Sequence, residues 1–471
     1  MKKVFLVACC WVLVTGLSAQ TITEKLQNAF QKFESDSQMK HAISSLYVID
    51  AATGQVVFDK NSQVGLAGAS TQKIITAATA FELLGKDYRY KTSINFIGGV
   101  VGETLNGGII VLGSGDPSFG SWRWQNTSEE KIIEKFAREI VGLGIKKIEY
   151  GLRVSGEVEW GQEIPDGWII QDIGNYYGAG SSHLNWRENQ FDVYLKSGDK
   201  IGDLVKIVGY KPRLYFGPYS SEVKSAAKGS GDNAYIYQNP YIIRGTIPIN
   251  ENKFQISGSM KYPSWEFLST LEDELVNKGI IIGKDDPTKT NMFFHLGMHL
   301  MYTHYSPSLD SLIYWFLKKS INLYGEALVK TFAYNFDSTV NRFGSIERVA
   351  STNNGISIVK KFWKDKGLDE DELNIYDGSG LSPLNRITTH AQVEVLKYAN
   401  TKDWFPYFYD ALPEYNGMKM KSGTISDVKG FCGYQKSKDG KEYIFSFLVN
   451  NYNGKTSGVV NKMYKVLDEL K

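Results

Sequence analysis

A lysine interrupts a helix that is otherwise apolar. The segment "LAGASTQKIITAATAFELLG", residues 66–85, places Ser70 among small residues, Lys73 three positions later, and then a run built for burial. Positions i and i+3 share a helix face, so the Ser70 hydroxyl and the Lys73 amine are predicted to meet. Burial can lower a lysine pKa from about 10.4 by as much as ~3–5 units. Lys73 is therefore a candidate base for a Ser70 nucleophile.

The size and composition indicate a folded protein of two or three domains. The chain has 471 residues, of which 42% are hydrophobic and 22% charged, values typical of globular proteins. Its formal net charge is +2. Removal of Lys2 and Lys3 with a leader would bring that charge to zero. A neutral balance argues against a nucleic-acid binder.

Residues 1–19 are predicted to be a cleaved export signal. Two lysines precede an apolar run at 4–17, and small residues follow before Gln20. The run is shorter than the ~20 residues of a membrane span. "LVAC", ending at Cys9, resembles a lipoprotein box, but the apolar run continues beyond it, so lipidation is not expected. We expect a periplasmic or secreted protein whose mature chain keeps one cysteine, Cys432, and therefore no intramolecular disulfide.

The pattern along the chain predicts an α/β (α+β) domain that is split in sequence. Residues 20–89 read as a helix, a hairpin and the helix of Ser70, and residues 305–471 as helices, three strands and a closing amphipathic helix. That last helix is expected to pack on the sheet and not on a membrane. Residues 90–304 alternate short β-rich runs with glycine turns and read as one or more inserted β-rich domains.

Two further motifs follow the insertion. Ser320-Ile321-Asn322 precedes an amphipathic helix, and Lys421-Ser422-Gly423-Thr424 lies on a terminal strand. A hydroxyl and an amide from a second element can relay a proton, a strand cation can bind a carboxylate, and Gly423 lets a substrate backbone approach. Simpler explanations stay open. The first motif could cap a helix, and Lys421 could be an edge-strand charge.

The order Ser-x-x-Lys, Ser-x-Asn, Lys-Ser/Thr-Gly resembles the signature of penicillin-recognising serine enzymes. Further stretches resemble blocks of the D-alanyl-D-alanine carboxypeptidases/endopeptidases of the class C low-molecular-weight penicillin-binding proteins (penicillin-binding protein 4 type). These are "GASTQKIITAATA", "GSGDPSFG", "YDGSGLSPLNRIT" and "KSGTISDVKGFCGY". The long separation of Ser70 from Ser320 is also characteristic. The chain departs from the pattern at Ile321, where aspartate is usual, and at Ser422, where threonine is commoner.

The resemblance implies a penicillin-binding transpeptidase-like fold, with helices around an antiparallel sheet. It implies a serine DD-peptidase that cleaves peptidoglycan stem peptides through an acyl-enzyme and is acylated by β-lactam antibiotics. The implied roles are Ser70 as nucleophile, Lys73 as base, Ser320 as proton donor to the leaving amine, and Asn322 as the group that orients Lys73 and substrate. Lys421, Ser422 and Thr424 would hold the terminal carboxylate, and the N–H groups of Ser70 and Thr424 would form the oxyanion hole.

One part of the insertion is predicted to read the substrate. "GWIIQDIGNYYGAGSSHLNW" resembles the family stretch in which an acid after a tryptophan contacts the amino group of diaminopimelate, and Asp172 is at the matching place. A solvated loop carboxylate is the alternative. No cofactor and no metal are expected: His295 and His299 lack the glutamate of a zincin helix and suit a strand. A β-lactamase or esterase on this scaffold, or a non-catalytic wall-binding module, are the alternative functions.

Overall fold

The computed structural model describes residues 20–156, 159–215, 218–284, 297–337 and 349–471. The predicted export signal, residues 1–19, and His295 lie outside the described residues. Within these ranges, no helix combines the length and hydropathy that crossing a bilayer requires.

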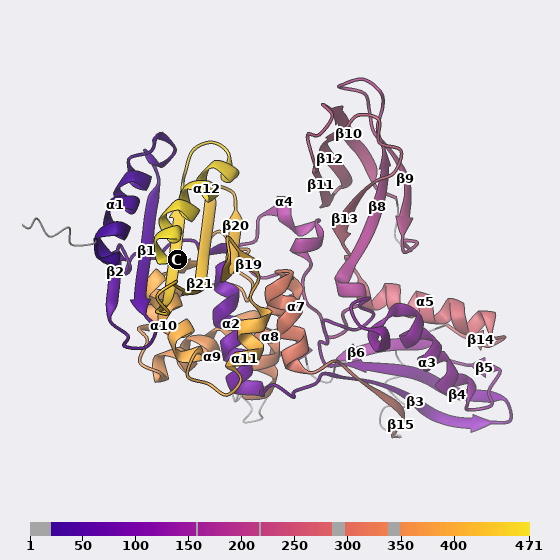
Figure 1. Ribbon diagram of the computed structural model, residues 1–471. Coiled ribbons are helices and arrows are strands. Elements are labelled where there is room, and N and C mark those ends of the chain that lie inside the picture. The colour runs from indigo at the N-terminus through magenta and orange to yellow at the C-terminus, as the bar shows by residue number, and fades with distance from the viewer. Residues whose placement is uncertain (1–19, 157–158, 216–217, 285–296, 338–348) are drawn as a thin grey trace, which may run out of the picture.

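Residues from both ends of the described chain form one antiparallel sheet with the strand order β19-β20-β21-β22-β1-β2. Strand β1 (Ile43–Asp50) pairs with β22 (Glu442–Asn450) along its whole length, and Figure 1 shows these indigo and yellow strands side by side. The other strands are β2 (Val56–Lys60), β19 (Glu414–Tyr415), β20 (Met418–Ile425) and β21 (Val428–Lys436). The predicted α/β fold around an antiparallel sheet is confirmed. The domain boundaries at 89/90 and 304/305 stay a prediction.

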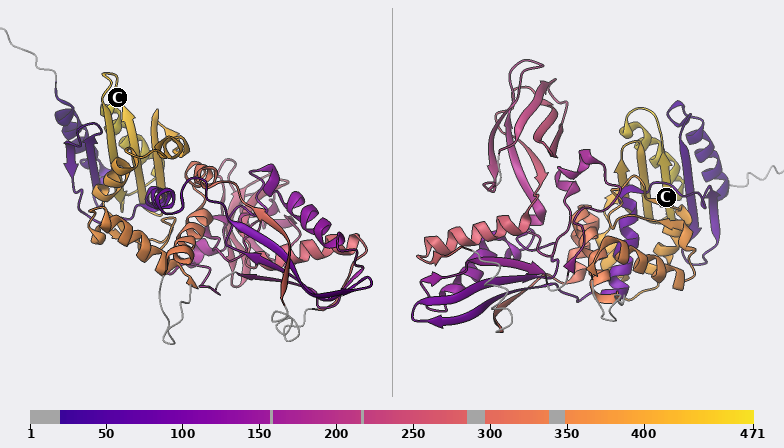
Figure 2. Two further views of the ribbon diagram at one scale, coloured as in Figure 1. Left: turned by 90° about the horizontal axis from the view of Figure 1, so that it is seen from below. Right: turned by 180° about the vertical axis from the view of Figure 1, so that it is seen from behind.

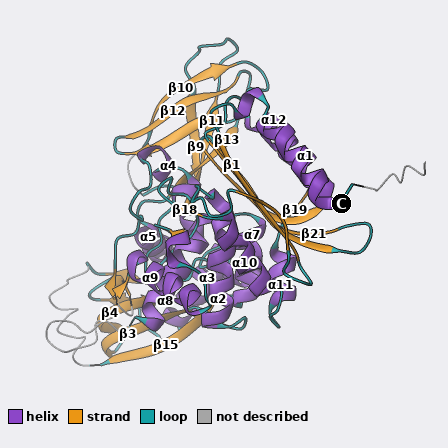
Figure 3. Cartoon of the chain, turned by 90° about the vertical axis from the view of Figure 1, so that its left-hand side faces the viewer, coloured by secondary structure: helices purple, strands orange, loops and turns teal. Residues whose placement is uncertain are grey.

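Helices cover both faces of this sheet because its side chains alternate. In β1, Leu46 and Val48 pack toward α1 (Ile22–Glu34) and α12 (Thr456–Leu467), which lie together on one side in Figure 3. Tyr47 and Ile49 face the opposite cluster, as the two-residue period of a strand requires. The closing helix α12 buries its apolar face there. Its packing on the sheet is thus confirmed.

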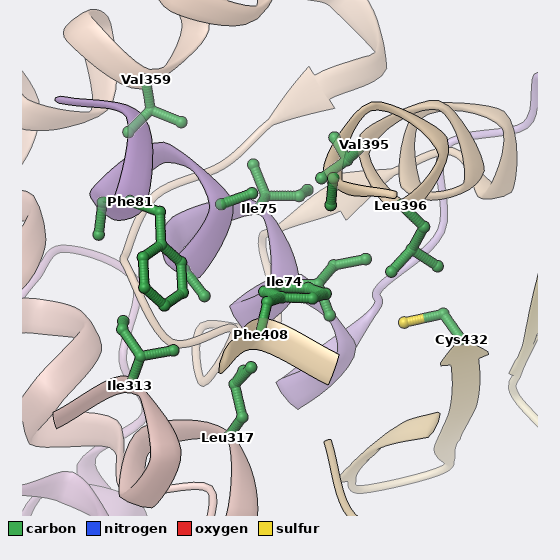
Figure 4. Close-up of a cluster of buried hydrophobic side chains, with 14 of the residues drawn as sticks. Ile74, Ile75, Phe81, Ile313, Leu317, Val359, Val395, Leu396, Phe408 and Cys432 are labelled. Atoms are coloured by element: carbon green, nitrogen blue, oxygen red, sulfur yellow. The ribbon is translucent and has the colours of Figure 1, made fainter. Parts of the chain in front are cut away.

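The opposite face of the sheet holds α2 (Lys73–Leu84), whose residues are buried from Lys73 to Phe81. Figure 4 shows Ile74, Ile75 and Phe81 among side chains from the surrounding helices and from β21. Full burial of each such side chain contributes about 1.5–3 kcal/mol, so α2 is held firmly in place. The helices around it are α7 (Leu309–Lys318), α8 (Asn322–Phe336), α9 (Thr352–Asp365), α10 (Thr389–Ala399) and α11 (Phe405–Ala411).

The middle of the chain forms two further lobes, seen apart from the first sheet in Figures 1 and 2. One lobe pairs β3 (Lys91–Val101) with β4 (Thr104–Gly113) and with β15 (Met298–Tyr305), the strand expected for the histidine segment. It also contains two helices that the sequence reading missed, α3 (Glu129–Val141) and α5 (Pro263–Asn277). Short strands complete this lobe: β5 (Lys147–Ile148), β6 (Leu152–Gly156) and β14 (Ile281–Ile282).

The second lobe consists of two three-stranded sheets, β13-β8-β9 and β10-β12-β11. Their strands are β8 (Gln190–Lys196), β9 (Lys206–Lys211), β10 (Ser220–Ala226), β11 (Asn233–Gln238), β12 (Tyr241–Pro248) and β13 (Phe254–Ser259). The remaining short elements are β7 (Glu159–Trp160), α4 (Ile170–Ile173), β16 (Val349–Ala350), β17 (Leu373–Asn374) and β18 (Arg386–Ile387). Helix α4 lies between the second lobe and the first sheet (Figure 1).

Lys330, on α8, ties the insertion to the helices of the first domain. Its side chain is fully buried, and its Nζ donates to the carbonyl oxygens of Gln162 at 2.7 Å, Glu163 at 3.3 Å and Ser181 at 2.6 Å. These carbonyls bracket residues 162–181, the segment that contains α4. Because buried carbonyls need donors, one amine fixes both ends of this segment against α8.

Replacement of Lys330 by methionine should therefore destabilise the protein. The three carbonyls would lose the donor that the fully buried Lys330 side chain supplies, a loss of about 1–3 kcal/mol. Scanning calorimetry should show a lower unfolding midpoint for Lys330→Met. Lys361→Met on α9 is the control, since Lys361 forms an exposed ion pair with Asp365 and surface changes stay within about 0.5 kcal/mol. Equal midpoints for the two variants would contradict this role of Lys330.

Candidate active site

Ser70 lies in a short 3₁₀ helix, η2 (Ala69–Gln72), directly before α2. The sequence reading placed Ser70 and Lys73 in one α-helix, whereas α2 begins only at Lys73. Their contact is nevertheless present: Lys73 Nζ donates to Ser70 Oγ at 3.0 Å. Ala69 has a φ of +46°, a conformation that non-glycine residues rarely adopt and that is often found at functional sites.

The Lys73 amine is fully buried and held by groups from two other segments. Its Nζ donates to Asn322 Oδ1 at 2.6 Å and to the carbonyl oxygen of Ser379 at 2.7 Å. Burial lowers the pKa of Lys73 to about 7, although the charges of Asp377 and Glu326 act in the opposite direction. A large fraction of the amine is thus unprotonated at neutral pH, as a general base requires.

The second and third motifs meet through Lys421. Its Nζ donates to Ser320 Oγ at 3.0 Å and to the carbonyl oxygen of Ser422 at 2.9 Å. Burial, together with the charge of Lys73, holds the pKa of Lys421 well below its usual range. The N-cap of α8 is Ile321, without a side-chain hydrogen bond, so helix capping does not explain this motif. The Ser320 hydroxyl instead faces an amine that can exchange a proton with it.

Gly423 is required by the nucleophile's own turn. A Cβ at this position would lie 2.4 Å from the carbonyl oxygen of Gly68 and 2.9 Å from the amide nitrogen of Ser70, closer than real Cβ atoms come to backbone. The sequence reading assigned Gly423 to the approach of a substrate. The structure adds that only glycine lets β20 lie this close to the Ser70 amide, which is a candidate oxyanion donor.

A cleft of about 500 Å³ is lined by five of the predicted site residues, whereas Lys73, Lys421, Ser422 and Gly423 lie outside its lining. Ser70, Ser320, Asn322, Thr424 and, from α4, Asp172 line it. Burial raises the pKa of Asp172, while a hydrogen bond from the Tyr177 side chain acts against this rise. The insertion therefore supplies a half-buried carboxylate to the same cleft as the nucleophile. Across the described ranges, no three His, Cys, Asp or Glu side chains gather as a metal ion would need.

The insertion also orients Asn322. The Nδ2 of this amide donates to the carbonyl oxygen of Tyr177 at 2.7 Å, and its Oδ1 accepts from Lys73. An amide has distinct donor and acceptor ends, so the Tyr177 carbonyl determines that the oxygen end points at the lysine.

Two buried carboxyl groups that the sequence reading passed over shape the turn at residues 377–382. Asp377 accepts hydrogen bonds from Trp168 Nε1 at 2.9 Å, Gly380 N at 2.7 Å and Ser382 N at 2.6 Å. Glu326, one turn after Asn322 on α8, accepts from the amide of Gly378 at 3.1 Å. Together they present the Ser379 carbonyl to Lys73. The "YDGSGLSPLNRIT" block resembles a block of the family, but no local pattern indicates which of its residues has this task.

The lowered pKa of Lys73 predicts how acylation depends on pH. Only the unprotonated amine can accept the Ser70 proton, so the rate of Ser70 acylation by a labelled penicillin should rise with pH, with a midpoint near 7. His390→Gln is the control for the titration of a histidine, because its ring pairs with Glu372 outside the cleft. A flat profile between about pH 6 and 8, or a midpoint that moves in His390→Gln, would exclude Lys73 as the base.

Comparisons with known proteins identify the family and the fold of this chain. The chain is 23% identical over 422 residues to D-alanyl-D-alanine carboxypeptidase DacB of Haemophilus influenzae, covering 85% of this chain and 83% of that protein. It is 23% identical over 460 residues to a D-alanyl-D-alanine carboxypeptidase of an Actinomadura species, covering 89% and 80%. The crystal structure of penicillin binding protein 4 from Haemophilus influenzae superposes with a TM-score of 0.76 at 20% identity, covering 94% of this chain and 98% of that one. The sequence profile of the D-Ala-D-Ala carboxypeptidase 3 (S13) family matches residues 26–414, and this chain belongs to that family.

Proposed function

We propose that this protein trims and un-crosslinks peptidoglycan stem peptides outside the cytoplasm, with Ser70 as its acyl-carrying nucleophile. Membership of its family makes it a serine-type D-Ala-D-Ala carboxypeptidase. The observation that carries the assignment of the site is the buried Lys73 amine, 3.0 Å from Ser70 Oγ. An amine in this place has the pKa and the geometry to activate a serine.

In the acylation step, Ser70 Oγ attacks the carbonyl carbon between two D-alanine residues and its proton passes to neutral Lys73. The oxyanion is stabilised by the N–H groups of Ser70 and Thr424, since Gly423 brings β20 against the Ser70 amide. Ser320, held by the Lys421 amine at 3.0 Å, passes a proton to the leaving amine, and the proton that Lys73 took from Ser70 replaces it, so Lys73 is neutral again. Water then attacks the ester, Lys73 accepts the proton of the water and passes it to Ser70 Oγ as the ester bond breaks, and Ser70 is regenerated.

The cleft supports a substrate that carries a positive charge away from the scissile bond. Asp172 lines the cleft but comes from the insertion, so it would read a part of the peptide distinct from the D-alanines. The free amine of diaminopimelate is such a group. A penicillin binding protein 4 structure that resembles this chain, with a TM-score of 0.70, is complexed with a β-lactam. This supports β-lactams as covalent inhibitors here.

The predicted export signal supports a periplasmic or secreted location, where peptidoglycan is found. It also agrees with a chemistry that needs no cytoplasmic cofactor, since the proton transfers use only the protein's own side chains.

A labelled penicillin tests the proposed function. Mass spectrometry should locate a covalent adduct on Ser70, and Ser70→Ala should lose it, together with cleavage of a D-alanyl-D-alanine peptide. Ser357→Ala is the matched control, because Ser357 and Lys360 repeat the Ser-x-x-Lys spacing on the surface of α9. Rapid loss of the adduct would favour a β-lactamase or esterase. A protein that forms no adduct and cleaves no peptide would be a non-catalytic wall-binding module.

Asp172→Asn tests whether Asp172 binds the side chain of the third stem-peptide residue. Loss of the charge should lower kcat/KM for diaminopimelate peptides roughly 5- to 30-fold, as expected for a partly solvated ion pair. Penicillin lacks this group and should acylate Ser70 at near the wild-type rate. Asp166→Asn, an exposed change in the same segment, is the control. Acetylation of the substrate amine should produce a similar loss in the wild type and little further loss in Asp172→Asn; additive losses would exclude the pair.

A further inference from the structure

Lys429 is a second buried lysine beside the third motif. It lies on β21, directly opposite Thr424 of β20 in the strand register, and its side chain is only 7% exposed. Its Nζ donates to Thr424 Oγ1 at 2.9 Å and to Ser422 Oγ at 3.3 Å. These are the two hydroxyl groups that the sequence reading assigned to the terminal carboxylate, and Thr424 lines the cleft beside Ser70.

These contacts leave both hydroxyl groups as donors. A hydroxyl oxygen that accepts from an ammonium keeps its own hydrogen free to turn toward another acceptor. The positive charge behind Ser422 and Thr424 also polarises their O–H bonds. Two polarised donors on one strand form a suitable contact for a carboxylate, because hydrogen bonds to ionised groups are the strong ones.

Lys429 also lacks a counter-charge. Among the described residues, no carboxylate lies within ion-pair distance of its Nζ; the Phe431 ring lies 4.6 Å away, and the charges of Lys429 and Lys421 repel each other. Burial of an unpaired ammonium is unfavourable. A substrate carboxylate bound by Ser422 and Thr424 would supply the missing negative charge from the cleft.

We propose that Lys429 makes this enzyme selective for substrates that carry a carboxylate on the leaving amino acid, acting through the hydroxyl groups of Ser422 and Thr424. This inference rests on the proposed function, since it concerns the same cleft. Lys429 is a positioning residue and not a catalytic one, because its amine contacts the two hydroxyl groups and not the reacting atoms.

Lys421 is less suited to that task. Its amine is turned toward Ser320 and the Ser422 carbonyl, and burial with the charges of Lys73 and Lys429 disfavours its protonated form. Burial lowers the pKa of Lys429 only to about 8, so most of this amine is charged at pH 7. Of the two lysines at the third motif, Lys429 is therefore the better partner for an anion.

The test compares one peptide in two forms: acyl-D-alanyl-D-alanine with its free carboxylate, and the same peptide ending in an amide. The kcat/KM ratio of acid to amide should fall roughly 10- to 100-fold in Lys429→Met, the range expected for hydrogen bonds to a charged group. The fall should come mainly from a higher KM for the acid. Lys429→Arg should restore most of the ratio. Lys436→Met, an exposed lysine on the same strand, should retain the wild-type ratio.

An unchanged ratio in Lys429→Met, or equal losses on acid and amide, would overturn the role of Lys429 while leaving the proposed function intact. The role of Lys429 would also be overturned if Lys429→Arg hydrolysed the amide at the wild-type rate but did not restore the kcat/KM ratio of acid to amide. If the wild-type protein cleaves neither peptide, the proposed function fails and the role of Lys429 fails with it. The wild-type rates alone therefore distinguish failure of the proposed function from failure of the role of Lys429.

Discussion

The Lys73 amine is the point on which the rest of the site depends. It is buried at the start of α2 and contacts Ser70, Asn322 and the Ser379 carbonyl, which come from three separate parts of the chain. Burial favours the neutral amine, whereas the nearby carboxyl groups favour the charged one. The balance of these effects places its pKa near 7, where a base can both take and return a proton.

The inserted segment positions the groups that surround Lys73, although it is remote from them in sequence. Trp168 donates to Asp377, which holds the turn of the Ser379 carbonyl, and the Tyr177 carbonyl orients Asn322. Lys330 fixes the same segment from α8. The contacts that bring Asp172 into the cleft are thus continuous with those that position the base. Substrate reading and lysine positioning depend on one interface.

Much of this could be predicted from the sequence, and the failures have physical causes. Ordered motifs identify Ser70, Lys73 and Lys421 because their chemistry restricts spacing and residue type. The contacts of Asp377 and Lys429 are not local: one depends on a turn folded against the insertion, the other on strand register. Helix α3 was missed although Ser128 caps it and its apolar residues follow a helical period. The helical period is present in this segment, but the short β-rich runs on both sides of it led to the prediction of a β-rich domain.

Charge is distributed unevenly across the cleft. Asp377 and Glu326 lie on the side of Lys73, whereas the third motif has Lys421 and Lys429 without an acidic partner among the described residues. If a substrate carboxylate fills that vacancy, the same contact serves both proposed reactions. Trimming releases D-alanine and un-crosslinking releases an amino acid of the neighbouring stem, and each leaving amine carries a carboxylate on the adjacent carbon. Contacts at β20 and β21 would then recognise the leaving amino acid, while Asp172 would recognise the part of the peptide that acylates Ser70. An enzyme built in this way can accept both free termini and cross-links without a change in its catalytic groups.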